Sequence, residues 1–383
     1  MDFDLSEEEK ILVKDIKNFM RREVTPIIEE YEKKGELPPF SLIKKLVPFG
    51  YIGGILPEKD GGHGMSYPLY GILTEELGGT WCSLQTIIMS LNTALLIISR
   101  FGTEYQKEKF IPLLLSGEKI VFIGVTEPDV GSDIRGIETN AVLEKDFYII
   151  NGTKTLIING SVADLGILFA LTNKNKDHRE LSAFIVEKGI SGYKTNDIKK
   201  TGLHSSVLSD IILNNSRIPR ENLFGQETEG FKIVFETINQ ARFSTSCALV
   251  GMAQAAIDAS INYAKTRNQF GRPIGSFQLI QKLIVDMVIE TEAARLLSYR
   301  VGSLLDKRMR CNKEVSIAKL FASQMALDVA LKAIQIHGGY GYTEDYPLAR
   351  YYRDIRHLTM ADGTSEIQTL IIGRDILGIS AFN

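Results

Sequence analysis

The fold class of this chain is decided by residues 147–158, which read Phe-Tyr-Ile-Ile-Asn-Gly-Thr-Lys-Thr-Leu-Ile-Ile. Two runs rich in aromatic and β-branched residues flank Asn151-Gly152, a dipeptide typical of tight turns, and the pattern predicts two strands joined by a hairpin. Further short strands are expected at 183–186 and 210–213, with a turn at 214–216 (Asn-Asn-Ser). Residues 119–225 are therefore predicted to form a middle β-domain, sandwich-like or barrel-like.

Helical patterns occupy the chain on both sides of this section. Near the N-terminus, Ser6 and Glu9 form a capping box, and apolar residues follow at helical spacing. Further helices are expected at 84–98, 231–264, 277–306 and 315–337, which contain few helix breakers.

The order of these sections predicts an α+β multi-domain protein. We expect an N-terminal helical domain at 1–118, the middle β-domain at 119–225 and a C-terminal four-helix bundle domain at 226–383. A doubly wound parallel sheet would instead alternate strands with helices along the chain.

Composition excludes several classes of protein. A net charge of −3 and a pI near 6.1, with no dense basic stretch, argue against a nucleic-acid partner. The three cysteines are far apart, so neither a disulfide framework nor a metal site is indicated. The N-terminus is acidic and lacks the pattern of an export signal, and we expect no apolar run of membrane-spanning length. A cytoplasmic protein is expected.

The common nucleotide-binding motifs are missing, because no GxGxxG follows a strand and no GxxxxGK[ST] occurs. The entrance to the β-rich section instead reads Val-Thr-Glu-Pro-Asp-Val-Gly-Ser-Asp at 125–133. Small hydroxyl residues and glycine in such a turn can bring backbone N–H groups against a phosphate or a flat ring.

Three further segments carry chemistry. Residues 267–271 (Arg-Asn-Gln-Phe-Gly) end a helix with a cation and an aromatic ring, and residues 335–342 (Gln-Ile-His-Gly-Gly-Tyr-Gly-Tyr) end the next in a glycine-rich turn. Residues 360–368 (Met-Ala-Asp-Gly-Thr-Ser-Glu-Ile-Gln) place one carboxylate, Asp362, before a glycine turn and a helix start. That arrangement can present a base to a buried substrate.

Together, these motifs resemble those of the acyl-CoA dehydrogenase family, and the resemblance covers essentially the whole chain. The family patterns T-E-P-x-x-G-S-D, R-x-x-F-G, Q-I-x-G-G-x-G-Y and E-G-T-x-x-I-Q are matched at 126–133, 267–271, 335–342 and 362–368, the last with one substitution. The resemblance implies FAD as cofactor, a homotetramer built as a dimer of dimers, and an electron-transfer flavoprotein as electron acceptor. It also implies removal of an α-proton from an acyl thioester by a carboxylate while a hydride passes from the β-carbon to flavin N5.

Residue by residue, the resemblance makes Asp362 the catalytic base and Gly363 a donor of the N–H that polarises the thioester carbonyl. Arg242 and Ser132 would border the thioester arm. The other expected cofactor-binding residues are Val125, Thr126, Gly131, Ser132, Ile158, Arg267, Gln269, Phe270, Gln335, Gly338, Gly339, Thr364 and Glu366, with Arg267 and the 335–339 turn acting across a subunit boundary.

Two departures from the family pattern bear on the reaction. The usual base is glutamate, and Asp362 is one methylene shorter, which retracts the carboxylate by roughly 1.5 Å, a displacement that can cost about a hundredfold in rate. Some family members carry the base on the helix instead, just before the arginine matched by Arg242. Here that position is Ala241, which cannot act as a base. Ile158 stands where a hydroxyl ordinarily bonds flavin N5, and Leu156 stands where an aromatic is usual, so the flavin's potential or its electron partner is expected to differ.

Three functions remain open from the sequence. The first is FAD-dependent α,β-dehydrogenation of an acyl-CoA. The second is dehydrogenation or oxidation of a carrier-protein-bound, hydroxylated or aminated acyl thioester in a biosynthetic pathway. The third is a non-catalytic flavin-binding homologue that has lost the standard base.

Overall fold

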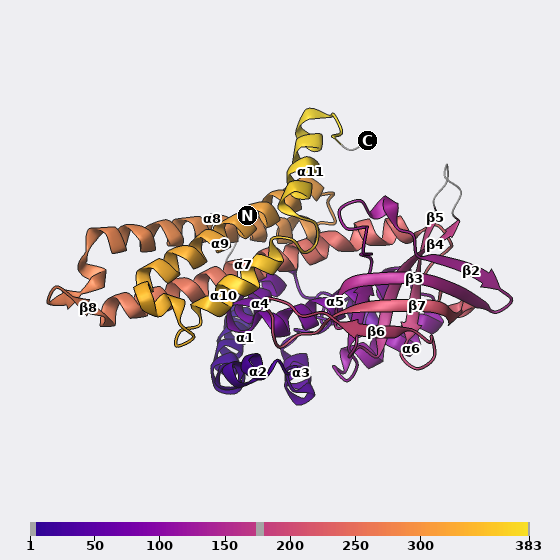
Figure 1. Cartoon of the computed structure of the whole chain (residues 1–383), viewed down its shortest axis with the longest axis horizontal. Helices are drawn as coiled ribbons and strands as arrows, with labels where there is room; N and C mark the ends of the chain where they lie inside the picture. Colours follow the sequence, from indigo (N-terminus) through magenta and orange to yellow (C-terminus); the bar gives the residue numbers. More distant parts are fainter. Residues whose placement is uncertain (1–4, 174–179, 382–383) are drawn as a thin grey trace.

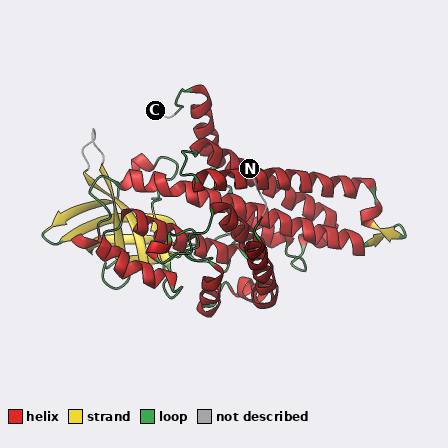
Figure 2. Cartoon of the chain, turned by 180° about the vertical axis from the view of Figure 1, so that it is seen from behind, coloured by secondary structure: helices red, strands yellow, loops and turns green. Residues whose placement is uncertain are grey.

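The computed structural model describes residues 5–173 and 180–381 and shows three parts (Figures 1 and 2). The N-terminal part contains α1 (Glu7–Phe19), α2 (Ile28–Lys34), α3 (Phe40–Leu46), α4 (Tyr67–Thr80), α5 (Cys82–Phe101) and α6 (Glu104–Leu115). The C-terminal part contains α7 (Gly230–Thr266), the short β8 (Asn268–Gln269) and β9 (Arg272–Pro273), α8 (Gln278–Asp306), α9 (Asn312–His337), α10 (Leu348–Leu358) and α11 (Ser365–Leu377). The predicted α+β fold class, with helices on both sides of a β-domain, is confirmed.

The middle part is a β half-barrel of seven strands. Its strands are β1 (Val121–Gly124), β2 (Asn140–Glu144), β3 (Phe147–Ile158), β4 (Leu165–Asn173), β5 (Glu180–Glu187), β6 (Lys194–Asp197) and β7 (Leu208–Pro219). They lie in the order β1-β4-β2-β3-β7-β6, with β5 on β4; β1 runs parallel to β4 and most other pairs are antiparallel. The sheet sits at one end of the molecule (Figure 2).

The hairpin predicted at Asn151-Gly152 is wrong, because 147–158 is one continuous strand. The register of β3 against β7 shifts between Ile150 and Gly152, opposite the Asn-Asn pair at 214–215 that was predicted as a turn. Two turn-like sequences therefore face each other as one bulge, where Asn151 Oδ1 accepts from the Asn215 N–H at 2.8 Å. Gly152 is required there, since a Cβ would lie 2.4 Å from Thr139 Oγ1.

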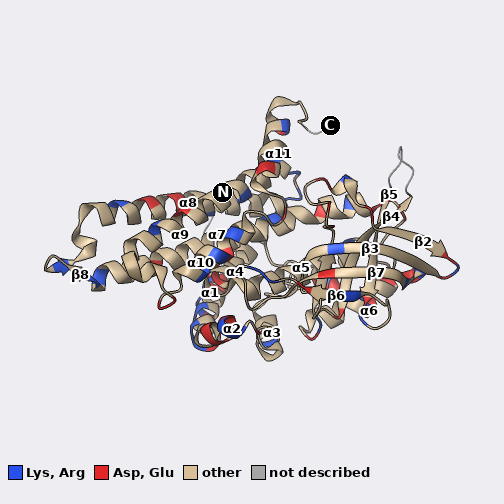
Figure 3. Cartoon of the chain, in the orientation of Figure 1, with Lys and Arg blue, Asp and Glu red and all other residues tan. Residues whose placement is uncertain are grey.

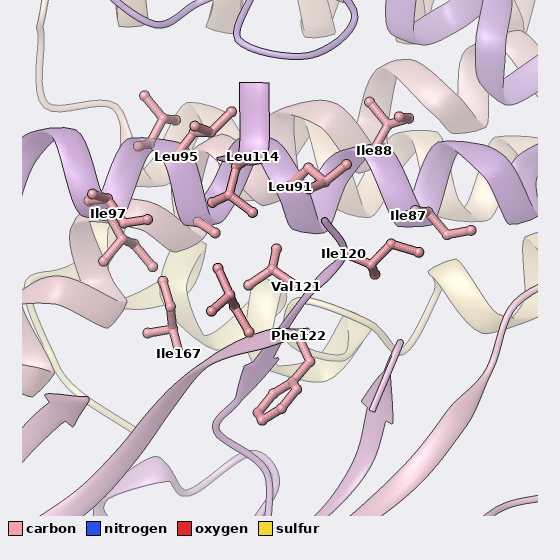
Figure 4. Packing of buried hydrophobic residues seen from close by; sticks show 14 of the residues in the cluster. Ile87, Ile88, Leu91, Leu95, Ile97, Leu114, Ile120, Val121, Phe122 and Ile167 are labelled. Carbon is pink, nitrogen blue, oxygen red and sulfur yellow. The ribbon is translucent and has the colours of Figure 1, made fainter. Parts of the chain in front are cut away.

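Helix α5 corrects the expectation that no apolar run has membrane-spanning length. Its 20 residues pass that test by length and composition, but 83% of its most apolar window is buried inside the protein. Figure 4 shows α5 above Val121 and Phe122 of the β-domain, with Ile87 and Ile97 on the side of the helix that faces them. The apolar run is the core joining the N-terminal and middle parts.

The junction of the three parts contains two buried carboxylates. Glu32 of α2 accepts hydrogen bonds from Trp81 Nε1 at 2.8 Å and from the backbone N–H of His204 at 3.1 Å. Asp354 of α10 accepts from the backbone N–H of Leu203 at 2.6 Å, and its second oxygen has no partner among the described residues. Burial, the largest cause, raises the pKa of Asp354 from its ordinary value of 3.8 to about 7.

A pH-dependent stability follows from Asp354. Because its pKa is raised in the folded state, its stabilising contribution is complete below about pH 4 and is lost as pH rises to about 7. We expect Asp354→Asn to raise the free energy of unfolding at pH 8, on the order of a few kcal/mol, with little effect at pH 4. Unfolding midpoints at the two pH values measure this, with the exposed Asp15→Asn as control. An equal effect at both pH values would contradict it.

Candidate active site

The segment that contains Asp362 is a turn between α10 and α11. Side chains from other elements hold this turn by donating hydrogen bonds to its backbone carbonyl oxygens. Lys319 Nζ of α9 donates to the carbonyl oxygens of Thr359 at 3.1 Å and Gly363 at 3.0 Å. Arg242 Nε of α7 donates to the Asp362 carbonyl at 2.9 Å, and Gln368 Nε2 bonds the carbonyls of both Asp362 and Gly363. Lys319, Arg242 and Gln368 are buried, so three side chains lock this turn in place.

The locked turn holds Asp362 in a strained conformation. Its φ is +56°, in the left-handed region that non-glycine residues rarely adopt, and such strain persists only where the surroundings over-determine it. Gly363 has φ +94°, and a Cβ there would lie 3.2 Å from the Arg242 guanidinium. A backbone outlier at a fixed carboxylate is typical of functional sites.

This geometry leaves one backbone N–H of the turn without a partner among the described residues. In a trans peptide the C=O and the next N–H point in opposite directions, and the Asp362 C=O points at Arg242 and Gln368. No residue within 5–173 or 180–381 accepts a hydrogen bond from the Gly363 N–H. A free N–H therefore lies beside the carboxylate, as an oxyanion donor must.

The Asp362 carboxylate contacts α7 as well. Thr245 Oγ1, fully buried, donates to Asp362 Oδ2 at 2.8 Å and lies 3.8 Å from Met89 Sδ of α5. Arg242 and Thr245 are three residues apart and so share one face of α7. One helix face thus holds Asp362 by its backbone and by its side chain.

Three basic groups near Asp362 are perturbed by burial. Desolvation lowers the pKa of Lys319 to about 8, although the Asp362 charge opposes the shift. Desolvation likewise lowers the pKa of Arg242 and of His357, again opposed by Asp362. A low-dielectric environment with a carboxylate at its edge suits proton transfer.

The β-domain carries the second group of predicted site residues. Val125 and Thr126 are half-buried after β1, and the Thr126 carbonyl accepts from the Thr155 N–H at 2.9 Å. Glu127 faces inward, where its carboxylate pairs with Lys154 Nζ at 2.8 Å, and Lys154 also donates to the Val125 carbonyl at 3.0 Å. Val125 is therefore anchored by a buried ion pair, and Thr126 is anchored by the backbone of β3.

The rest of this group lies more openly. Gly131 and Ser132 are exposed in the loop after β1. Leu156 is 56% exposed with φ +57° at the second bulge of β3, and Ile158, at the strand end, is half-buried. The aliphatic side chain of Ile158 cannot donate the hydrogen bond that a hydroxyl residue at this position would give to flavin N5.

The third group lies at the opposite end of the molecule from the sheet, beside β8 (Figure 1). A cavity of about 1090 Å³ is lined there by Arg267, Gln269, Phe270, Gly338 and Gly339, among others. A Cβ built at Gly338 or Gly339 meets nothing within 4 Å, so the backbone is open to a ligand. Figure 3 shows basic residues clustered near this end. A cation beside open backbone amides fits the pyrophosphate of FAD.

One chain does not bring all predicted residues together. Asp362, Gly363, Thr364 and Arg242 meet in the turn, where Thr364 caps α11, while Glu366 points outward. The cavity near β8 and the β-domain residues lie at opposite ends (Figure 1). Gln335 is exposed in the last turn of α9.

Several residues that hold the site were not predicted from the sequence. Thr245 could have been predicted, because it lies three residues after Arg242 and therefore on the same face of the same helix. Lys319 interrupts the buried Val315–Ala322 stripe of α9, which marks a buried cation. The Glu127–Lys154 pair joins residues 27 apart in the chain, and nothing local in the sequence indicates it.

Comparisons with known proteins agree along the whole chain. Family models described as acyl-CoA dehydrogenase N-terminal, middle and C-terminal domains match residues 6–118, 123–216 and 228–377. The chain is 37% identical to glutaryl-CoA dehydrogenase of Desulfococcus multivorans, covering 100% of both chains. It is also 37% identical to the caffeyl-CoA reductase-Etf complex subunit CarC of Acetobacterium woodii, over 97% of this chain and 99% of that protein. The structure of butyryl-CoA dehydrogenase from Megasphaera elsdenii matches with a TM-score of 0.94 and 35% identity, covering 98% of this chain and 100% of that one.

Proposed function

Because the chain belongs to the acyl-CoA dehydrogenase family, we propose that it is an FAD-dependent enzyme that dehydrogenates short or branched acyl-CoA thioesters, with Asp362 as the base. The family and its named relatives are oxidoreductases acting on CH–CH donors. The observation that carries the proposal is the strained, locked turn that sets the Asp362 carboxylate beside the free Gly363 N–H.

In this reaction the chain's own residues handle the proton and the carbonyl. The Gly363 N–H donates to the thioester carbonyl oxygen, which makes the α-proton more acidic. Asp362 takes that proton and becomes a neutral carboxylic acid, while a C=C bond forms between the α- and β-carbons. Bound FAD would supply the acceptor for the hydride that leaves the β-carbon.

Arg267, Gln269, Phe270, Gln335, Gly338 and Gly339 are proposed to hold the pyrophosphate side of FAD, and Val125, Thr126, Gly131, Ser132, Ile158 and Thr364 its other side. Since these groups lie at opposite ends of one chain, a second copy must supply one of them. Exposed apolar residues on α8, Leu279, Val285 and Ile289, offer a face for that copy. This supports a homo-oligomer, and the dimer of dimers that the family resemblance implies is kept as a proposal.

The electron acceptor is proposed to be an electron-transfer flavoprotein, because a relative of nearly equal length is named as part of an Etf complex. The three cysteines are free and buried, which fits the proposed cytoplasmic location. The second candidate function keeps the same fold and base but takes a carrier-bound or α-substituted acyl group. The shorter Asp362, held back on Thr245, favours it by leaving room at the α-carbon.

The deciding experiment is anaerobic mixing of the FAD-loaded protein with a panel of thioesters, followed by the visible absorbance of the flavin. Butyryl-CoA and isobutyryl-CoA are expected to bleach it. The same acyl groups on a carrier protein, and 2-hydroxybutyryl-CoA, form the matched comparison. Bleaching by these alone would move the assignment to the second candidate. A flavin that no thioester bleaches would point to a non-catalytic homologue.

A further inference from the structure

Among the described residues, Thr245 of α7 is the one whose side chain hydrogen-bonds the carboxylate of the proposed base, Asp362. Lys319, Arg242 and Gln368 all bond backbone carbonyls of the turn, whereas Thr245 Oγ1 donates to the Asp362 carboxylate at 2.8 Å. Thr245 is fully buried on α7, a 37-residue helix that also contacts α4, α5, α8 and α9. Its hydroxyl therefore has little freedom to move.

The spacing of this contact is matched to aspartate. The backbone of residue 362 cannot retreat, because its carbonyl is bonded by Arg242 and by Gln368. A glutamate there would carry its carboxylate about 1.5 Å farther along the side chain, past the Thr245 hydroxyl, unless it adopted a bent rotamer. The aspartate and the threonine thus form a geometric pair.

We propose that Thr245 is a positioning residue for Asp362, and that the pair adapts this active site to a base one methylene shorter than glutamate. The hydroxyl fixes the direction in which the carboxylate points, so that the carboxylate is held ready for the α-proton. This inference rests on the proposed function, in which Asp362 accepts that proton.

The test is a double-mutant cycle of the FAD-loaded protein: wild type, Thr245→Val, Asp362→Glu and the double variant. The rate of anaerobic flavin reduction by butyryl-CoA and isobutyryl-CoA is measured for each. Thr245→Val should slow reduction about ten- to a hundredfold in the aspartate protein, as expected for a lost hydrogen bond to a charged group. In the Asp362→Glu protein, Thr245→Val should change the rate of flavin reduction by no more than about twofold, because the contact with residue 362 is already broken.

Two further readouts separate positioning from general damage. With α-deuterated butyryl-CoA, the isotope effect on reduction should grow in Thr245→Val, because proton removal becomes more rate-limiting. Thr245→Ser keeps the hydroxyl and should restore reduction to within about threefold of wild type. Thr237→Val is the matched control on the same helix: Thr237 is also buried, but its hydroxyl bonds the carbonyl of Ile233 at 2.7 Å, and its loss should leave the rate unchanged.

Each outcome decides something. An equal loss from Thr245→Val in both backgrounds, or no loss in the aspartate protein, would overturn the pairing while leaving the proposed function standing. If neither thioester reduces the flavin of the wild-type protein, the proposed function is overturned for these substrates, and the pairing is overturned with it. Coupling confined to the aspartate background, with rescue by serine, is the result expected.

Discussion

Replacement of Asp362 by asparagine is expected to slow flavin reduction by about a thousandfold or more while leaving the fold and the FAD content intact. An amide cannot accept a proton at neutral pH, and general bases contribute on this scale. Asparagine is nearly isosteric, its oxygen can still accept from Thr245, and the turn stays held by Lys319, Arg242 and Gln368. Anaerobic rapid mixing with butyryl-CoA measures the rate.

The control for this variant is Asp258→Asn, because Asp258 is an exposed carboxylate on α7, and Gln254 is its one hydrogen-bond partner within residues 5–173 and 180–381. That change should leave reduction unaltered. Unfolding midpoint and flavin absorbance per chain verify that Asp362→Asn remains folded and loaded. Reduction of the asparagine protein at a rate near that of wild type would show that the α-proton goes to another group.

Replacement of Lys154 by methionine is expected to give the largest loss of stability, about 3–5 kcal/mol. Lys154 is fully buried and pairs with Glu127 at 2.8 Å, and the change leaves the Glu127 carboxylate buried without its counter-charge. It also frees the Val125 carbonyl, which Lys154 bonds at 3.0 Å, so FAD content should fall. Thermal and urea unfolding measure the first effect, and flavin absorbance per chain the second.

Lys44→Met is the matched control, because Lys44 pairs with Glu118 at the same 2.8 Å but in solvent. Its cost should stay within about 0–1 kcal/mol. The double variant Glu127→Gln, Lys154→Met removes both buried charges and should recover part of the lost stability. Equal costs for Lys154→Met and Lys44→Met would show that burial of the Glu127 pair does not matter.

The sequence was sufficient for the long helices, because their periodicity reflects a buried face that the chain encodes locally. The helix expected at 231–264 spans Gly230–Thr266, and the capping box at Ser6 and Glu9 is present. Turn residues were less reliable. Asn151-Gly152 and Asn214-Asn215 each signal a turn when taken alone, and only their pairing across β3 and β7 makes them a shared bulge.

For the active site, the sequence alone determined the family and the cofactor and predicted Asp362 as the candidate base, since each rests on residue types in contiguous motifs. Tertiary structure alone decided how that base is held. Lys319, Arg242 and Thr245 reach the 359–363 turn from helices 40 to 120 residues away, and hydrogen bonds over such separations have no local signature. The strain at Asp362 is likewise a tertiary property, because the packing around the turn imposes it.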